Sequence, residues 1–194
     1  MKTCVLYSGG KDSSLMGVML KRLGVDVEFY TVNFGVYDSY IPASKSAKAL
    51  GFKHNVLKLD EEILSKACYM IMDDGFPNDG IKFIHESVVE TIADDFDIIG
   101  DGTRRDDRTP KLNINQVKSL EDRKNLQYIN LDSFGHKSVR FITDNLFRIS
   151  HEKSNRTNSS DYEVEIRTFI DEAGGSSKDI FPEHYQTRVI GYKE

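Results

Sequence analysis

Thr3-Cys4-Val5-Leu6-Tyr7-Ser8-Gly9-Gly10-Lys11-Asp12-Ser13-Ser14 is the stretch that decides the fold of this chain of 194 residues. An apolar run of strand length leads into a polar loop with two adjacent glycines, and an amphipathic stretch from Leu15 to Leu23 follows. This order predicts a strand, a loop and a helix. Because adjacent glycines allow positive φ and a close backbone approach to an anion, the loop is typical of a phosphate site.

The polar residues of the loop each have a candidate role. Ser13 or Ser14 is expected to cap the helix, whose N-terminal amides and dipole favour bound phosphate. Lys11 can add positive charge, and Asp12 can hold Mg²⁺. The spacing differs from a Walker A loop, which has four residues between its glycines and ends in Gly-Lys-Ser/Thr. A tight strand-to-helix turn without a ligand is the alternative.

The order Ser-Gly-Gly-Lys-Asp-Ser from residue 8 to residue 13 resembles the pyrophosphate loop of the PP-loop ATPases, the superfamily of the N-type ATP pyrophosphatases. The resemblance covers roughly the first half of the chain. As a whole, the sequence is similar to an uncharacterised archaeal-type group described as adenine nucleotide alpha-hydrolase-like or asparagine-synthase-like. This implies that ATP is cleaved between its α and β phosphates, with adenine against the backbone of residues 32–34. The candidate nucleotide-binding residues are Ser8, Gly9, Gly10, Asp12, Ser13, Ser14, Val32, Asn33, Phe34 and Gly100.

Strand and helix signals alternate along the chain. Strands are expected at 3–7, 25–34, 54–59 and 96–100, and helices at 15–23, 40–50, 60–73, 81–94, 113–126, 139–147 and 162–173. This alternation predicts an α/β fold with a doubly wound, mostly parallel five-stranded sheet of Rossmann-like type. We expect a single domain over 1–194, with a core to about residue 110 and a smaller helical and extended C-terminal extension.

The segment after the expected strand 96–100 is a second site candidate, because ligands bind at the carboxyl ends of parallel strands. Gly100–Arg108 carries three aspartates and three arginines. Its aspartates could hold Mg²⁺ or a nucleophile, and Arg104, Arg105 or Arg108 could bind the α-phosphate. An ion-paired surface loop is the alternative. Asp106-Asp107 resembles the paired aspartates of many PP-loop enzymes. The candidate catalytic residues are Lys11, Asp12, Arg104, Arg105, Asp106 and Asp107, and the candidate metal ligands are Asp12, Asp101 and Asp106.

Composition limits the function classes. The net charge of −5 argues against a protein that coats nucleic acid, although basic residues gather in the third quarter of the chain and could meet an RNA substrate. Cys4 and Cys68 are too few for a four-cysteine zinc site and are expected to be buried. No apolar run approaches membrane-spanning length, and no signal-like segment is present, so a cytoplasmic location is expected.

The C-terminal residues leave two alternatives open. In an extended segment from Phe181 to Gly191, the side chains of His184, Gln186 and Arg188 share one face. They could contact a substrate, with His184 as acid or base, or they could form a strand edge or dimer seam. The polar segment 151–160 is expected to be flexible.

The resemblance to PP-loop ATPases, together with these patterns, leads to one main functional hypothesis and two alternatives. The main hypothesis is an enzyme that uses ATP and Mg²⁺ to adenylate a substrate oxygen, so that nitrogen or sulfur displaces AMP. A small molecule or an RNA, including tRNA, is the expected substrate, and a nitrogen or sulfur donor protein and a homodimer partner are considered. The alternatives are a sensor or partner subunit that binds adenine nucleotides without turnover, and a phosphate-ester hydrolase.

Overall fold

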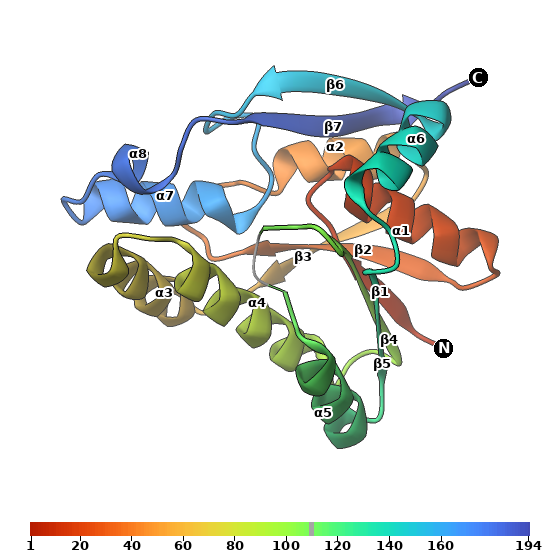
Figure 1. Cartoon of the computed structure of the whole chain (residues 1–194), viewed down its shortest axis with the longest axis horizontal. Helices are drawn as coiled ribbons and strands as arrows, with labels where there is room; N and C mark the ends of the chain where they lie inside the picture. Colours follow the sequence, from red (N-terminus) through yellow and green to blue (C-terminus); the bar gives the residue numbers. More distant parts are fainter. Residues whose placement is uncertain (109–110) are drawn as a thin grey trace.

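The centre of the molecule is a parallel sheet (Figure 1). The computed structural model describes residues 1–108 and 111–194. The strands are β1 (Thr3–Leu6), β2 (Val27–Asn33), β3 (Lys53–Lys58), β4 (Ile98–Arg104) and β5 (Gln127–Leu131), in the spatial order β3-β2-β1-β4-β5. All four neighbouring pairs are parallel, which confirms the predicted α/β fold. The strand order reverses between β1 and β4, where such sheets bind ligands.

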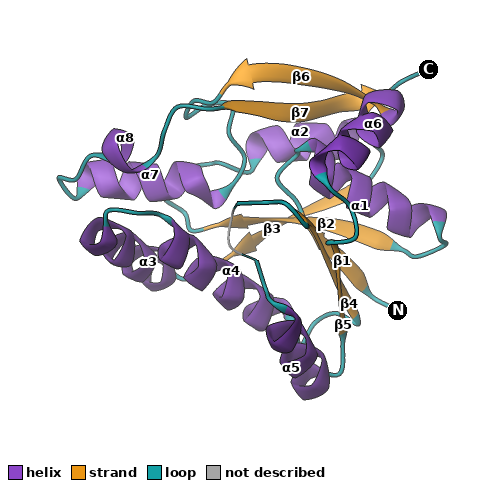
Figure 2. Ribbon diagram, in the orientation of Figure 1, coloured by secondary structure: helices purple, strands orange, loops and turns teal. Residues whose placement is uncertain are grey.

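Helices cover both faces of this sheet (Figure 2). The side chains of β1 alternate, so Val5 and Tyr7 pack on one face and Cys4 on the other. The first face carries α1 (Lys11–Arg22), α2 (Ile41–Ala49) and α6 (His136–Leu146). The second face carries α3 (Glu61–Asp74), α4 (Asn78–Ile92), α5 (Ile114–Lys124) and α7 (Tyr162–Glu172). The short helix α8 (Ser177–Ile180) follows α7.

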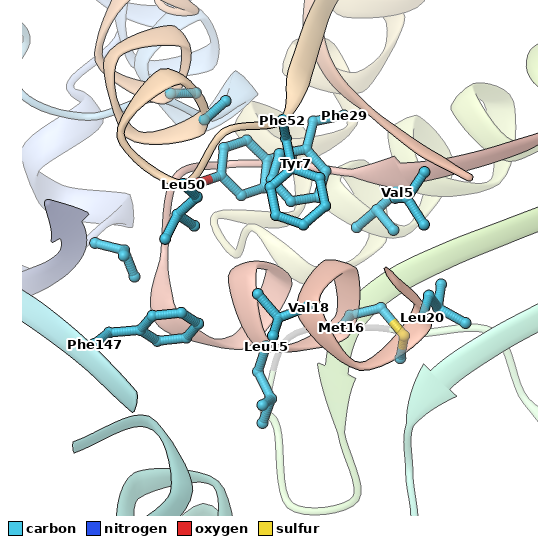
Figure 3. Close-up of a cluster of buried hydrophobic side chains, with 14 of the residues drawn as sticks. Val5, Tyr7, Leu15, Met16, Val18, Leu20, Phe29, Leu50, Phe52 and Phe147 are labelled. Carbon is cyan, nitrogen blue, oxygen red and sulfur yellow. The ribbon is translucent and has the colours of Figure 1, made fainter. Parts of the chain in front are cut away.

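An aromatic stack lies under the loop between β1 and α1 (Figure 3). The Tyr7 ring stacks on Phe29 at a centroid distance of 3.9 Å, and Phe29 stacks on Phe52 at 4.2 Å. All three side chains are buried. Large buried aromatic side chains contribute strongly to core stability, so the point where β1 ends is held rigidly.

The C-terminal extension adds an antiparallel hairpin of β6 (Phe147–Lys153) and β7 (Tyr185–Tyr192). Phe147 and Val189 are fully buried in the same core as α1 and α2. The Val189 N–H donates to the carbonyl oxygen of Gly9 at 3.0 Å, and the Ser46 hydroxyl donates to the Val189 carbonyl at 2.6 Å. The extension therefore holds the loop between β1 and α1 in place.

Several predicted boundaries were wrong. β4 runs to Arg104 rather than ending at Gly100, so half of the expected site loop is strand. α4 begins at Asn78, inside the segment that was expected to be a turn. The helix can begin there because Pro77 precedes it, and proline suits the beginning of a helix. β6 occupies residues 147–153, which were expected to end a helix and to begin a flexible segment; pairing with β7 stabilises this polar strand. No helix in the described part of the chain is long and apolar enough to span a membrane.

Candidate functional site

A cleft of about 600 Å³ opens at the carboxyl edge of the sheet. Its volume lies within the range of small-molecule sites. The first group of lining residues surrounds the amino end of α1 and comprises Ser8, Gly10, Lys11, Asp12, Ser13, Gly102, Thr103, Arg104, Asp107 and His136. The second group is more apolar and includes Leu6, Val32, Ile81, Val88 and Tyr162. The cleft therefore has charged and apolar walls, and its lining also includes the acidic residues Asp161 and Glu163.

The amino end of α1 has no side-chain cap. The N-cap residue is Gly10, and the helix begins at Lys11, so the prediction that Ser13 or Ser14 caps it was wrong. The Ser13 hydroxyl donates to the Gly10 carbonyl at 3.3 Å instead. Because the first amides of a helix have no intrahelical partner, this end of α1 presents N–H groups beside the cleft that have no hydrogen-bond partner among the described residues.

Two predicted loop residues are structural. Gly9 has a φ of 79°, and a Cβ atom there would lie 3.2 Å from the Cα of Ala43, so it packs against α2 rather than lining the cleft. Ser14 is fully buried, and its hydroxyl lies 3.1 Å from the Tyr7 hydroxyl. Of the predicted phosphate-loop residues, Ser8, Gly10, Asp12 and Ser13 line the cleft, together with the predicted catalytic Lys11.

β4 packs directly on this helix end. A Cβ atom at Gly102 would lie 2.5 Å from the Ser13 nitrogen, so only glycine fits without displacing the backbone. Gly100, which was predicted to bind the nucleotide, does not line the cleft. It packs in the core, where a Cβ atom would lie 3.1 Å from Val5 and 3.2 Å from Met16.

Charged side chains form a chain of ion pairs at the cleft. Lys11 Nζ lies 2.7 Å from Asp12 Oδ1, and Arg104 Nε lies 3.3 Å from Asp12 Oδ2. Arg104 also pairs with Asp107 through its side chain and its backbone N–H. Burial opposes the charge of Arg104, but Asp107 and Asp12 raise its pKa. Its buried Nη1 has no hydrogen-bond partner among the described residues. The Arg104 side chain therefore stays cationic, and its Nη1 remains available to donate a hydrogen bond.

The predicted roles of Asp106 and Arg105 are not supported by their positions. Both are exposed, and neither lines the cleft. Asp106 accepts a hydrogen bond from the His136 N–H at 2.8 Å, at the amino end of α6, and this bond lowers its pKa. No three His, Cys, Asp or Glu side chains of the described residues lie close enough to hold a metal ion together. The predicted metal ligands Asp12, Asp101 and Asp106 thus do not form one site.

Asp101 belongs to a buried network that the sequence did not reveal. Its carboxylate accepts from the Thr103 N–H at 2.7 Å and from the Tyr128 hydroxyl, and His85 Nε2 lies 3.3 Å away. Burial opposes ionisation of Asp101, but His85, Thr103 and Tyr128 together lower its pKa. The spacing of Ile81, His85 and Val88 on one face of α4 is the signal that could have identified His85.

The segment predicted to contact adenine divides into two parts. Val32 lines the cleft, whereas Asn33 and Phe34 are buried and do not. Asn33 organises the following turn, since its Nδ2 donates to the Tyr37 carbonyl at 2.7 Å. The Phe34 N–H donates to the carboxylate of Glu165 at 3.1 Å.

Glu165 is a fully buried carboxylate on α7 that holds this turn. It accepts from the backbone N–H groups of Phe34 and Val36 at 3.1 Å and of Tyr37 at 3.4 Å, and from the Ser39 hydroxyl at 3.3 Å. Burial raises its pKa, against the opposing effect of these hydrogen bonds. Nothing in the local sequence indicates this contact, because its partners lie more than a hundred residues away.

The C-terminal extension forms the last wall of the cleft. Tyr185, Gln186 and Thr187 line it from β7, while His184 and Arg188 do not. The Gln186 amide donates to Asn158 Oδ1 at 2.6 Å. The predicted row of His184, Gln186 and Arg188 therefore contributes a single residue to the cleft.

Comparison with known proteins places this geometry in a family. A crystal structure of a protein described as a predicted subunit of tRNA methyltransferase, from Methanocaldococcus jannaschii, matches with a TM-score of 0.94 and 48% identity, covering 100% of this chain and 99% of that one. An uncharacterised protein of the same organism is 49% identical over 195 residues, covering 100% of this chain and 98% of the relative. Since the family model matches residues 1–191, the chain belongs to the family of unknown function DUF7411.

Proposed function

We propose that the chain binds ATP in the cleft and cleaves it between the α and β phosphates to adenylate a substrate. The observation that carries this proposal is the uncapped amino end of α1, which begins at Lys11 and lines the same cleft as Arg104 at the edge of the parallel sheet. Free helix amides and adjacent cationic groups form a favourable site for phosphate.

The charged end of the cleft suits the phosphates. The Gly10–Ser13 backbone would hold pyrophosphate, and Lys11 would neutralise its charge. The unpaired Nη1 of Arg104 could donate to an oxygen on which negative charge develops, which is where a fixed donor accelerates a reaction most.

The residues of the cleft also fit a divalent cation. The lining carboxylates Asp12, Asp101, Asp107, Asp161 and Glu163 outnumber the lining cations Lys11 and Arg104. This excess of negative charge would repel ATP alone, whereas Mg²⁺ is bound by one or two carboxylates together with phosphate oxygens. Asp12 is the carboxylate nearest to the proposed phosphate site and would hold the ion.

The acceptor is proposed to be an RNA, with tRNA as the first candidate. The support is the description of the Methanocaldococcus jannaschii relative as a predicted subunit of tRNA methyltransferase. The same description supports a partner protein. The word subunit in that description also supports a second candidate function, in which the chain is a subunit that binds adenine nucleotides without turnover. Pairing of Asp12 with both Lys11 and Arg104 favours this reading, because the site balances part of its charge without a metal ion.

The test uses purified protein, Mg²⁺ and α-labelled ATP, with and without tRNA, followed by separation of AMP from ADP. We expect AMP, more of it with tRNA, and loss of AMP formation in Asp12→Ala. Asp122→Ala, an exposed carboxylate on α5, is the control and should keep full activity. ADP as the product would contradict the proposal. ATP binding without any product would favour the non-catalytic subunit.

A further inference from the structure

Strand β6 has one edge that no other strand of the described residues covers. β6 pairs with β7 alone, and β7 lies between β6 and α2 (Figure 1). Most side chains of β6 are exposed, including those of Arg148, His151, Glu152 and Lys153. An uncovered strand edge presents backbone N–H and C=O groups that can pair with another strand. This edge, formed by residues 147–153 and here called the β6 edge, is therefore a candidate interaction surface.

Hydrogen bonds at both ends of β6 show which of its backbone groups point outward. The Ser154 N–H donates to the His184 carbonyl at 2.9 Å, and the Lys193 N–H donates to the Leu146 carbonyl at 2.9 Å. In an antiparallel ladder, every second residue bonds to the neighbouring strand. The even-numbered residues of β6 therefore bond to β7, and the register shift after Arg148 adds a residue on β7 without changing this alternation. The outward N–H and C=O groups belong to Phe147, Ile149, His151 and Lys153.

These outward groups are largely open. Among the described residues, a side chain bonds to one of them, the Lys153 carbonyl, which accepts from Asn158 Nδ2 at 2.9 Å. The side chains of Phe147 and Ile149 pack in the core with α1 and α2, which holds the strand in place. The β6 edge is thus a preformed template for a further antiparallel strand.

Two opposite charges are placed symmetrically on the outer face of β6. Because Phe147 and Ile149 face the core, Arg148 and Glu152 lie on the opposite face, each two residues from Ser150 at the middle of the strand. The Arg148 guanidinium lies over Gly191 and has no ion-pair partner within the described part of the chain. Its side chain is exposed, so it is free to turn toward a neighbouring strand.

A second copy of β6 matches this pattern. Two antiparallel copies centred on Ser150 overlap over all seven residues, and Ile149 of each copy opposes His151 of the other, so that outward groups meet outward groups. In the same register, Arg148 of each copy opposes Glu152 of the other. Moving the register by two residues puts Ser150 or Ser154 opposite Arg148 instead. Since opposite charges directly across a ladder stabilise it, the charges favour the register centred on Ser150.

We propose that two copies of the chain form a symmetric dimer by antiparallel pairing of their β6 edges. The product is a four-stranded sheet in the order β7-β6-β6-β7. A surface that matches itself in this way has the two-fold symmetry of most soluble homodimers. Because Tyr185, Gln186 and Thr187 of β7 line the cleft, this sheet connects the cleft walls of the two copies. The dimer does not depend on the proposed cleavage of ATP.

Sedimentation velocity over a series of protein concentrations measures the dissociation constant of the dimer. Arg148→Glu and Glu152→Arg each place like charges opposite one another at two positions, and each should weaken the dimer about tenfold or more. The double variant restores opposite charges in exchanged order and should recover the native affinity. Lys118→Glu, an exposed change of the same sign on α5, is the control and should have no effect. A native protein that stays monomeric at every concentration would overturn the proposal, and so would a double variant as weak as the single ones.

His151→Pro tests the backbone pairing. Proline at this exposed edge position removes an outward N–H but no bond to β7, so the variant should keep its stability in urea and lose the dimer. In hydrogen exchange of the native protein, the amides of Ile149 and His151 should become protected as the concentration rises, whereas that of Ser150 should be protected throughout. A folded His151→Pro variant that still dimerises would refute the pairing. If the variant does not fold, the charge reversals and the exchange of Ile149 and His151 decide.

Discussion

Replacing Glu165 with alanine should detach the turn after β2 from α7. The carboxylate is fully buried and accepts hydrogen bonds from the backbone N–H groups of Phe34, Val36 and Tyr37 and from the Ser39 hydroxyl. Alanine offers these donors no acceptor. The substitution therefore tests whether the Glu165 side chain alone attaches α7, in the C-terminal extension, to the turn that follows β2.

The magnitude follows from the number of donors. Each buried donor left unsatisfied costs about 1–3 kcal/mol, and water reaching the turn recovers part of this. For three amides and a hydroxyl, we expect Glu165→Ala to lower the free energy of unfolding by about 3–6 kcal/mol. This is a large share of the roughly 5–15 kcal/mol that stabilises a typical domain. Glu165→Gln keeps one acceptor oxygen and should cost about 1–2 kcal/mol.

Urea denaturation of the native protein and both variants measures these values. Glu172→Gln, an exposed change on the same helix, is the control and should lie within about 0.5 kcal/mol of the native protein. Hydrogen exchange should also become faster at residues 34–39 in Glu165→Ala. A loss below about 1 kcal/mol for the alanine variant would refute the reasoning, because the donors would then have other partners.

Two further predictions concern residues beside the cleft. Gly102→Ala should destabilise the protein by about 2 kcal/mol or more, because the new Cβ atom would lie 2.5 Å from the Ser13 nitrogen. Urea denaturation measures the stability of the variant, and an ATP titration measures its binding. A variant as stable as the native protein would contradict the close packing of β4 on α1. Asp106→Asn should lower stability at neutral pH, because the folded protein lowers the carboxyl pKa. The advantage of the native protein should be complete above the ordinary value of 3.8 and disappear as the pH falls through the lower folded value, which thermal denaturation at several pH values can follow; an advantage that persists in acid would count against this role.

The sequence predicts those parts of the fold in which local and global signals agree. β1, the glycine loop and α1 follow one another within about twenty residues, and the apolar run, the glycines and the helical periodicity all favour the same structure. The same agreement places four of the five strands of the parallel sheet, whereas no sequence signal located β5. Ser8, Gly10, Lys11, Asp12 and Ser13 line the cleft as expected, because a strand-loop-helix unit places them at its edge.

The sequence prediction was wrong at positions whose structure depends on contacts with residues far away in the sequence. The Asp-Gly-Thr-Arg sequence after Gly100 is too polar to suggest a strand, yet residues 101–104 extend β4 beside α1. Asp106 was assigned to the cleft from its residue type and its position after the strand 96–100, although it lies at the amino end of α6. Asp101 and Glu165 depend on partners in other elements, which a single sequence does not place together.

The half of the chain with the weaker resemblance completes the cleft. The Val189 N–H of β7 donates to the Gly9 carbonyl in the loop between β1 and α1, and Glu165 of α7 holds the turn after β2. Ser160 and Asp161, which precede α7, line the same cleft. The wall around the amino end of α1 is therefore built mainly by the segments that resemble PP-loop ATPases, whereas another wall is built by the extension. If the proposed function holds, variation in this extension will change which substrate is used, and ATP binding will change little.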